Sequence, residues 1–204
     1  MVPDADGEPK LAIMRATYRA LCEHGYADLT MQDIADEAPV SKGSLHYHYD
    51  SKQGLFEAFQ QFISERFMAR LREADEPAAP PRERLAAILD AALSPPKRDD
   101  LQDLQRALLE LKAQAPYEPA IREHILAWDE EFRSLLVEVL ADGVESGDFR
   151  ADLDPESTAR FVVTVLAGNQ TRSVSVGQSP ETTRELLREH LETEIAAEPE
   201  ANAE

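Results

Sequence analysis

Apolar residues recur three or four positions apart along nearly the whole chain, and this spacing limits the fold more than any other feature. The clearest series runs at intervals of 4, 3, 4, 3 and 4 from Ile121 to Val139. Such intervals place side chains on one face of an α-helix, whereas a half-buried strand alternates at every second residue. No segment alternates convincingly, because Val174-Ser175-Val176 is short and follows a helical run. The sequence therefore predicts an all-α protein.

Capping residues, prolines and glycines divide the chain into nine expected helices. A Ser, Thr or Asp side chain at a helix start accepts a hydrogen bond from a free amide of the first turn. Thr30, Ser41, Ser51, Asp154 and Ser179 hold such positions, and a proline follows the last two where a helix tolerates it. The helices are expected around residues 10–24, 30–38, 41–49, 51–71, 85–93, 101–111, 121 to a close near 143–147, 155–166 and 179–191.

The stretch from Leu29 to Lys52 has the pattern of two short helices joined by a tight turn. Its expected inward residues are Ile34, Ala35, Ala38, Val40 and Leu45. The second helix begins with small residues at 41, 43 and 44, which allow its backbone to approach DNA bases closely. Serine, lysine and histidine side chains can donate hydrogen bonds to phosphates or base edges. The pattern predicts a DNA-reading helix-turn-helix.

Residues 10 to 60 also resemble, as a composite pattern, the amino-terminal domain of the TetR family of transcriptional regulators. The matching elements are Gly25-Tyr26, Leu29-Thr30, Ile34-Ala35, Ala38-Pro39-Val40-Ser41, Gly43-Ser44-Leu45-His46, Tyr49, Ser51-Lys52 and Leu55-Phe56. Two positions depart from the family pattern. Pro39 stands where the family usually has glycine, and His46 where it usually has a phosphate-contacting tyrosine. The first implies a turn without positive φ, and the second a shorter, pH-sensitive contact.

The resemblance implies a set of DNA-contacting positions. They are Thr30, Ser41, Lys42, Gly43, Ser44, His46, Tyr47, His48 and Lys52. Among them, Lys42 and Ser44 are expected to contact bases, Tyr47 to press on the backbone or a thymine methyl group, and Lys52 to hold a phosphate.

The same resemblance implies a domain organisation and a mode of action. We expect a flexible arm at 1–9, a helix-turn-helix domain at 10–54, a helical regulatory and dimerisation domain at 55–195, and a disordered acidic tail at 196–204. The implied protein is a homodimeric repressor on a palindromic operator in double-stranded DNA, released by a small lipophilic inducer. The implied ligand pocket holds Phe62, Leu104, Leu108, Trp128, Phe132, Phe161 and Val165. The implied dimer interface holds Phe161, Val165, Leu187 and Leu191.

The acidity of the chain at first argues against DNA as a partner. Its formal net charge is -19, and only five of its 21 basic residues are lysines. We interpret this excess as typical of a salt-loving source, whose cytoplasm screens self-repulsion. Between Ser41 and Lys52, two lysines and one aspartate leave a local balance of +1. Such a face releases few counterions, so we expect DNA binding to depend on salt unusually weakly, or to improve with it.

Other classes of function find little support in the sequence. We see no glycine-rich phosphate loop, no nucleophile arrangement and no cofactor motif, so we expect no enzyme. His46 and His48 point in directions about 200° apart on a helix, and we expect no metal site there. The absence of a long apolar run or a signal peptide predicts a cytoplasmic protein without a membrane partner. The alternative left open is a helical ligand-binding or protein-interaction module with a vestigial helix-turn-helix.

Overall fold

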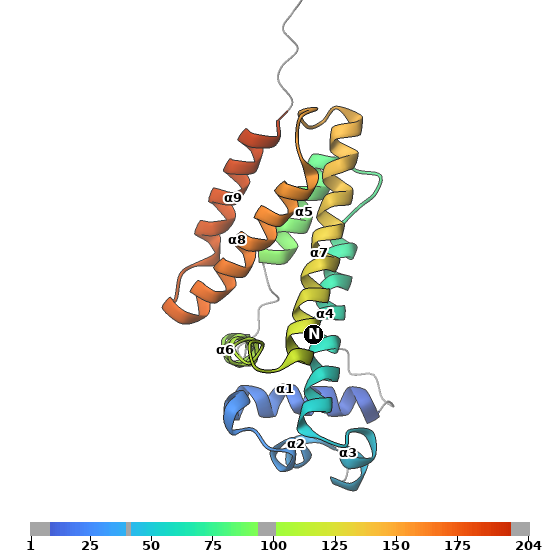
Figure 1. The fold of residues 1–204 in the computed structure, drawn as a ribbon, viewed down its shortest axis with the longest axis vertical. Helices are drawn as coiled ribbons and strands as arrows, with labels where there is room; N and C mark the ends of the chain where they lie inside the picture. The colour runs from blue at the N-terminus through green and yellow to red at the C-terminus, as the bar shows by residue number, and fades with distance from the viewer. Residues whose placement is uncertain (1–8, 40–41, 94–100, 197–204) are drawn as a thin grey trace, which may run out of the picture. The chain divides into compact units, whose positions relative to one another are not determined.

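The computed structural model describes residues 9–39, 42–93 and 101–196, and these ranges confirm the predicted all-α fold (Figure 1). The helices are α1 (Pro9–Asp28), α2 (Met31–Glu37), α3 (Lys42–His48), α4 (Lys52–Ala74), α5 (Pro81–Leu93), α6 (Leu101–Lys112), α7 (Pro119–Ser146), α8 (Pro155–Val176) and α9 (Pro180–Ile195). The described ranges hold no named strand, and their β-structure is one isolated bridge between Phe149 and Ala196. None of the described helices is long and apolar enough to cross a membrane.

The predicted caps of α2, α4, α8 and α9 are confirmed, whereas α5 begins at Pro81, four residues before its expected start. Thr30 and Asp33 form a reciprocal capping box at α2. Ser51 Oγ accepts from the Gly54 amide 3.1 Å away at the start of α4. Asp154 and Ser179 cap α8 and α9, each followed by a proline. Ser41, the expected cap of α3, lies outside the described residues. Local capping chemistry therefore sets the starts of these helices.

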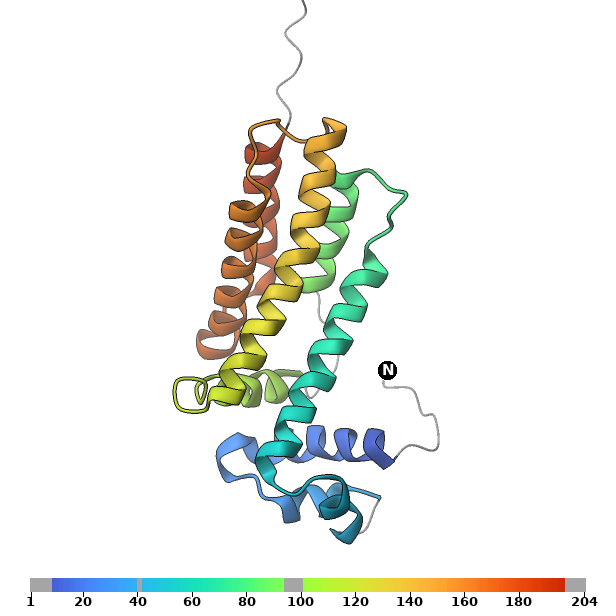
Figure 2. The same cartoon turned by 45° about the vertical axis from the view of Figure 1, so that its right-hand side comes forward.

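The chain forms two compact units. Unit 1 contains Met1–Ser64 and Lys97–Ile125, and so includes α1 to α3, the first part of α4, α6 and the start of α7. Its core joins buried side chains of α1, α2, α3, α4 and α6, among them Leu21, Ile34, Leu45, Phe56 and Leu111. Helix α6 packs against α1, and both ribbon views draw the two helices next to each other (Figures 1 and 2). Helices α2 and α3 therefore share one hydrophobic core with α6.

Unit 2 contains Glu65–Pro96 and Leu126–Glu204. Its core includes Met68, Leu136, Val139 and Val162, and α9 packs against both α5 and α8. Arg84, 6% exposed, is held by Asp75 at 2.6 Å and Asp142 at 2.7 Å. This ion-pair cluster ties the start of α5 to the segment after α4 and to the end of α7.

The compact units and the expected sequence domains are divided differently. The expected boundary between 54 and 55 falls within α4, a continuous helix that contributes residues to both units. Helix α6, expected in the regulatory domain, belongs to unit 1. The division into functional domains remains a proposal, and most of the expected arm and tail, 1–8 and 197–204, lies outside the described residues.

Candidate nucleic-acid interface

Helix α3 is anchored by one buried residue and presents its other side to solvent. Leu45 is fully buried in the core of unit 1, together with Ile34 and Ala35 of α2. Ala38, also predicted to face inward, is half-buried, and Val40 lies outside the described residues. The buried leucine fixes the rotation of the short helix, because any other rotation would expose it to water. The opposite face is consequently available to a partner.

Tyr47 and His46 are two predicted contacts on α3 that are exposed to solvent. Tyr47 is 86% exposed and its ring stands edge-on to the ring of His48, with centroids 5.4 Å apart. His46 is exposed, while His48 is half-buried. An exposed tyrosine combines a flat apolar ring with a hydroxyl group, which suits both a thymine methyl and a phosphate. In the described residues, no group of three or more His, Cys, Asp or Glu side chains could hold a metal ion.

The amino-terminal end of α3 is only partly described. Gly43 is exposed and Ser44 is half-buried, whereas Ser41 and the side chain of Lys42 lie outside the described residues. Before the turn, Ala38 is extended, with φ -87° and ψ 139°, as a residue preceding proline should be. Among the described residues, positive φ occurs only at glycines, which agrees with the expected turn at Pro39.

The hydroxyl of Thr30 already has a partner. It donates to Asp33 Oδ2 over 2.7 Å, and the Thr30 amide donates to the same oxygen over 2.8 Å. These two hydrogen bonds lower the pKa of Asp33, so the carboxylate is charged at neutral pH. A phosphate approaching the start of α2 would therefore meet a negative charge. The predicted Thr30 contact remains a proposal, and it requires the hydroxyl to be shared with Asp33.

Lys52 is directed into unit 1 in this structure. Its Nζ donates to the Tyr26 carbonyl oxygen over 2.9 Å and lies 4.9 Å from the centre of the Tyr26 ring. Burial lowers the pKa of Lys52, opposed by the nearby charges of Asp28 and Asp33. A lysine held in this way supports the last turn of α1, and its predicted phosphate contact remains a proposal.

The residues predicted to form a ligand pocket are distributed over both units. Phe62, Leu104 and Leu108 belong to unit 1, where Leu104 is buried and the other two are partly buried. In unit 2, Trp128, Phe132 and Val165 pack in one core cluster. The ring of Phe67 joins Trp128 and Phe132 in edge-on contacts at 5.4 and 5.8 Å. Core packing explains these contacts without a ligand, so the pocket remains a proposal.

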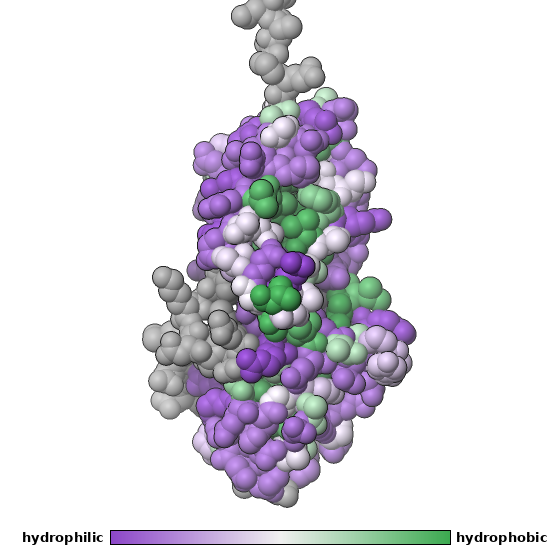
Figure 3. All heavy atoms as spheres, turned by 90° about the vertical axis from the view of Figure 1, so that its left-hand side faces the viewer, coloured by the Kyte–Doolittle hydropathy of each residue, from purple (hydrophilic) through white to green (hydrophobic). Residues whose placement is uncertain are grey.

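The four residues predicted at a dimer interface differ in their availability. Phe161 is 43% exposed and lies against the ring of His190, 5.1 Å away. Val165 is half-buried, while Leu187 and Leu191 are each only 4% exposed. The last two are already buried within unit 2, so a partner could cover little more of them. Figure 3 shows a gathering of apolar residues on the side of the molecule that carries α8 and α9. Phe161 of α8 and Leu186 of α9 are among the large apolar side chains that are exposed to solvent.

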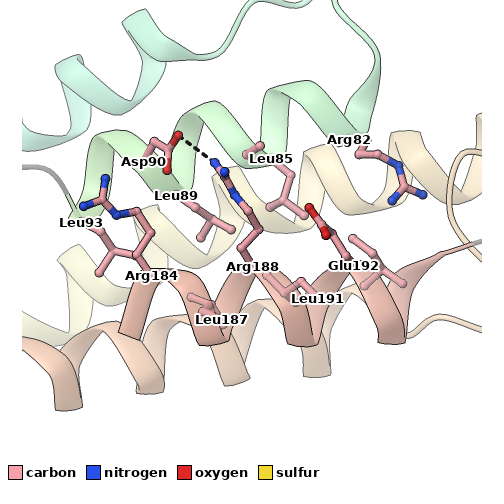
Figure 4. Close-up of a pocket in the computed structure, with 12 residues that line it drawn as sticks. Arg82, Leu85, Leu89, Asp90, Leu93, Arg184, Leu187, Arg188, Leu191 and Glu192 are labelled. Carbon is pink, nitrogen blue, oxygen red and sulfur yellow. Dashed lines mark hydrogen bonds and ion pairs between the residues drawn. The ribbon is translucent and has the colours of Figure 1, made fainter. Parts of the chain in front are cut away.

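A groove between α5 and α9 explains the burial of those two leucines (Figure 4). Leu187 and Leu191 of α9 point toward Leu85 and Leu89 of α5, and Arg188 reaches Asp90 across the groove at 2.9 Å. The cavity within this groove has a volume of only about 40 Å³. No residue of the predicted ligand pocket lines this groove.

The structure also reveals two functional candidates that no sequence pattern singles out. Glu110 of α6 accepts a hydrogen bond from the Tyr26 amide, 84 positions earlier in the chain. Arg84 forms the ion-pair cluster in unit 2. Both are charged residues on amphipathic helices, which usually face solvent, so their neighbours in sequence do not set them apart.

Two family models match the chain. The model described as "Bacterial regulatory proteins, tetR family" matches residues 13–59, which include α2, α3 and the start of α4. The model described as "BetI-type transcriptional repressor, C-terminal" matches residues 81–196, more than half of the chain. Together they account for most of the described residues.

Individual relatives agree with these matches. The HTH-type transcriptional repressor KstR2 of Mycobacterium tuberculosis is 29% identical over 140 residues, covering 69% of this chain and 68% of its own length. The repressor AcnR of Corynebacterium glutamicum is 27% identical over 179 residues, 86% of each chain. The crystal structure of a TetR transcription regulator from Haloarcula marismortui shares 38% identity and a TM-score of 0.85. That match covers 92% of this chain and 98% of the other.

Proposed function

This chain belongs to the TetR family of transcriptional regulators, and we propose that it acts as a homodimeric repressor whose α2 and α3 read an operator. The observation that carries the proposal is the orientation of α3. Leu45 is fully buried, whereas Tyr47, two positions later, is 86% exposed. A helix fixed by its inner face and open on its outer face can enter the major groove without rearrangement.

The proposed contacts differ in their chemistry. Lys42 and Ser44 would reach base edges, Tyr47 and His46 would meet the sugar-phosphate backbone or a thymine methyl group, and Gly43 would let the backbone approach. Ser41 and His48 complete the set. Thr30 and Lys52 would contribute phosphate contacts only if each shares or exchanges its present partner.

Dimerisation is proposed through the exposed apolar face of α8 and α9. Phe161 and Leu186 offer 43% and 61% of their surfaces to solvent. Large exposed apolar side chains that gather on one face mark interaction sites, and a two-fold interface would bring the same face of a second copy onto it. Two recognition helices would then bind the half-sites of a palindromic operator.

Release by a small lipophilic inducer is the regulatory part of the proposal. Trp128, Phe132 and Val165 form an aromatic and aliphatic cluster in unit 2 from which an apolar site could be built. An inducer can shift the protein only by its difference in affinity between DNA-binding and non-binding conformers.

The acidity supports a further proposal about conditions. A net charge of -19 suits a salt-rich cytoplasm, which screens repulsion both within the protein and toward DNA. A cytoplasmic location and a halophilic source follow from this reasoning as proposals. The helix-turn-helix would then bind DNA by shape complementarity and hydrogen bonding more than by long-range electrostatic attraction.

A mobility-shift assay with the upstream region of the protein's own gene tests the proposed function. The dimer should retard this fragment and leave a shuffled fragment of equal length unshifted. A folded protein that retards neither fragment at any salt concentration would favour a helical module with a vestigial helix-turn-helix.

A further inference from the structure

The last turn of α1, which follows a kink at Gly25 and leads into α2, is held by a carboxylate from a distant part of the chain. Glu110 of α6 accepts a hydrogen bond from the Tyr26 amide, with Oε2 2.8 Å from the nitrogen. Hydrogen bonds to a charged acceptor are stronger than those between neutral groups. The interaction lies within unit 1, where α6 packs along α1.

Gly25 makes room for this carboxylate. Its φ of 72° lies in the left-handed region, which glycine adopts without strain. A Cβ at this position would lie 3.0 Å from Glu110 Oε2, a contact tighter than nine in ten real Cβ contacts. The glycine therefore supplies both the backbone turn that ends the first part of α1 and the space that the Glu110 side chain occupies.

A second charged residue holds the other side of Tyr26. Lys52 Nζ donates to the Tyr26 carbonyl oxygen over 2.9 Å and lies near the rings of Tyr26 and Phe56. These two rings meet edge-on, with centroids 5.0 Å apart. The amide of Tyr26 is thus bonded to α6 and its carbonyl to α4, only three residues before Leu29, which is 2% exposed.

From this arrangement we infer that Glu110 is a positioning residue for DNA recognition. It fixes the Gly25-Tyr26 turn, and through it the start of α2, in the geometry that presents α3 to DNA. The inference rests on the proposed function and adds to it a residue outside the helix-turn-helix. If the turn reaches this geometry for only a fraction of the time, the apparent operator affinity falls by that same fraction.

Electrostatics and positioning predict opposite effects when Glu110 is replaced. Removing a negative charge from a chain at -19 should by itself tighten DNA binding, because repulsion from the phosphates decreases. Removing the hydrogen bond that positions the turn should weaken binding instead. The sign of the change therefore separates the two causes.

The experiment compares three variants of the full-length chain by fluorescence anisotropy on the operator fragment. Glu110→Ala removes the acceptor, Glu110→Gln keeps an acceptor oxygen without the charge, and Glu123→Ala removes the same charge from an exposed position of α7. We expect Glu110→Ala to bind about tenfold more weakly, a factor at the lower end for hydrogen bonds to charged groups. Glu110→Gln should bind nearly as the unchanged protein does, and Glu123→Ala equally or slightly more tightly.

Hydrogen exchange of the Tyr26 amide provides a readout that does not need DNA. In Glu110→Ala the exchange of this amide should accelerate by about tenfold. Without its hydrogen bond to Glu110, the turn opens locally more often, and the exchange rate reports this opening. Exchange in Glu123→Ala should stay close to that of the unchanged protein, and the loss of one hydrogen bond in Glu110→Ala should lower the midpoint of thermal unfolding by only a few degrees.

Several outcomes would overturn the inference. These are a Glu110→Ala variant that binds as tightly as Glu123→Ala, a Glu110→Gln variant as weak as Glu110→Ala, or an unchanged Tyr26 exchange rate. If the unchanged protein binds no DNA, the proposed function fails. The exchange rates then still decide whether Glu110 holds the turn.

Discussion

Replacing Arg84 with methionine should destabilise the protein by about 3 kcal/mol, the low end of the cost of breaking a buried ion pair. The guanidinium is 6% exposed and donates to Asp75 over 2.6 and 3.1 Å and to Asp142 over 2.7 Å. The side chain of Asp75 is 11% exposed and would remain buried without this partner. Asp142 is 46% exposed and can be hydrated, which is why the lower end applies.

Arg72→Met is the matched control. Arg72 and Glu131 also join two helices, at 2.5 Å, but are 60% and 43% exposed. Exposed pairs contribute about 0–1 kcal/mol, so the two variants should differ by about 2–3 kcal/mol. Urea unfolding at one fixed protein concentration measures this difference, because the stability of the proposed dimer would depend on concentration. Equal costs for the two variants would refute the reasoning that burial of Asp75 sets the magnitude.

Three further predictions concern packing, pH and salt. Gly143→Ala would place a Cβ far inside van der Waals contact with the Phe149 ring. It should lower the free energy of unfolding in urea by about 1–3 kcal/mol or more. The control Gly54→Ala makes only ordinary contacts and should leave this free energy unchanged or raise it by up to about 1 kcal/mol. Burial lowers the pKa of His124 below its ordinary 6.5. The stability associated with its neutral form is therefore complete above that pH and is lost as the pH falls through the lowered value. The free energy of unfolding of His124→Gln should depend less on pH in this range, and an identical pH dependence would contradict the assignment. Operator affinity measured against salt concentration should show a shallow or positive slope of log affinity on log salt, and a steep negative slope would contradict the role assigned to the acidic surface.

Helix starts could be predicted from sequence because their causes are local. The Thr30-Asp33 capping box and the Asp154 cap each involve residues within three positions of one another, so the interacting partners are visible in the sequence. The rotation of α3 followed equally from one apolar residue, Leu45, among polar neighbours.

Long-range partners could not be predicted in the same way. The glycine at 25 was expected to end a helix, but nothing near it indicates that Glu110 fills the space beside it. Lys52 stands at a helix start, where a phosphate or a carbonyl oxygen would satisfy it equally well, and the fold supplies the Tyr26 carbonyl.

The apolar face of α9 shows a third limit of sequence reasoning. The spacing of Leu187 and Leu191 indicates a buried face but does not distinguish a second copy of the chain from a helix of the same chain. The groove against α5 shows that these leucines are covered within the subunit. The solvent exposure of a side chain can be determined only once the fold is known. It is high for Phe161 and Leu186, which we therefore propose for the dimer contact.

Operator binding by the double variant Lys42→Ala with Tyr47→Ala decides whether α3 reads DNA, and fluorescence anisotropy measures it on a dimer verified by light scattering. The control is Lys112→Ala with Tyr117→Ala, which makes the same chemical changes outside the helix-turn-helix, at an 80% exposed tyrosine and a lysine of α6. If α3 reads DNA, the first variant should bind about 30-fold or more weakly, because one interaction with a base and one with the sugar-phosphate backbone are removed together. The control variant should bind nearly as the unchanged protein does. Undiminished operator binding by the folded dimer of the first variant would contradict the assignment of α3 as the DNA-reading helix.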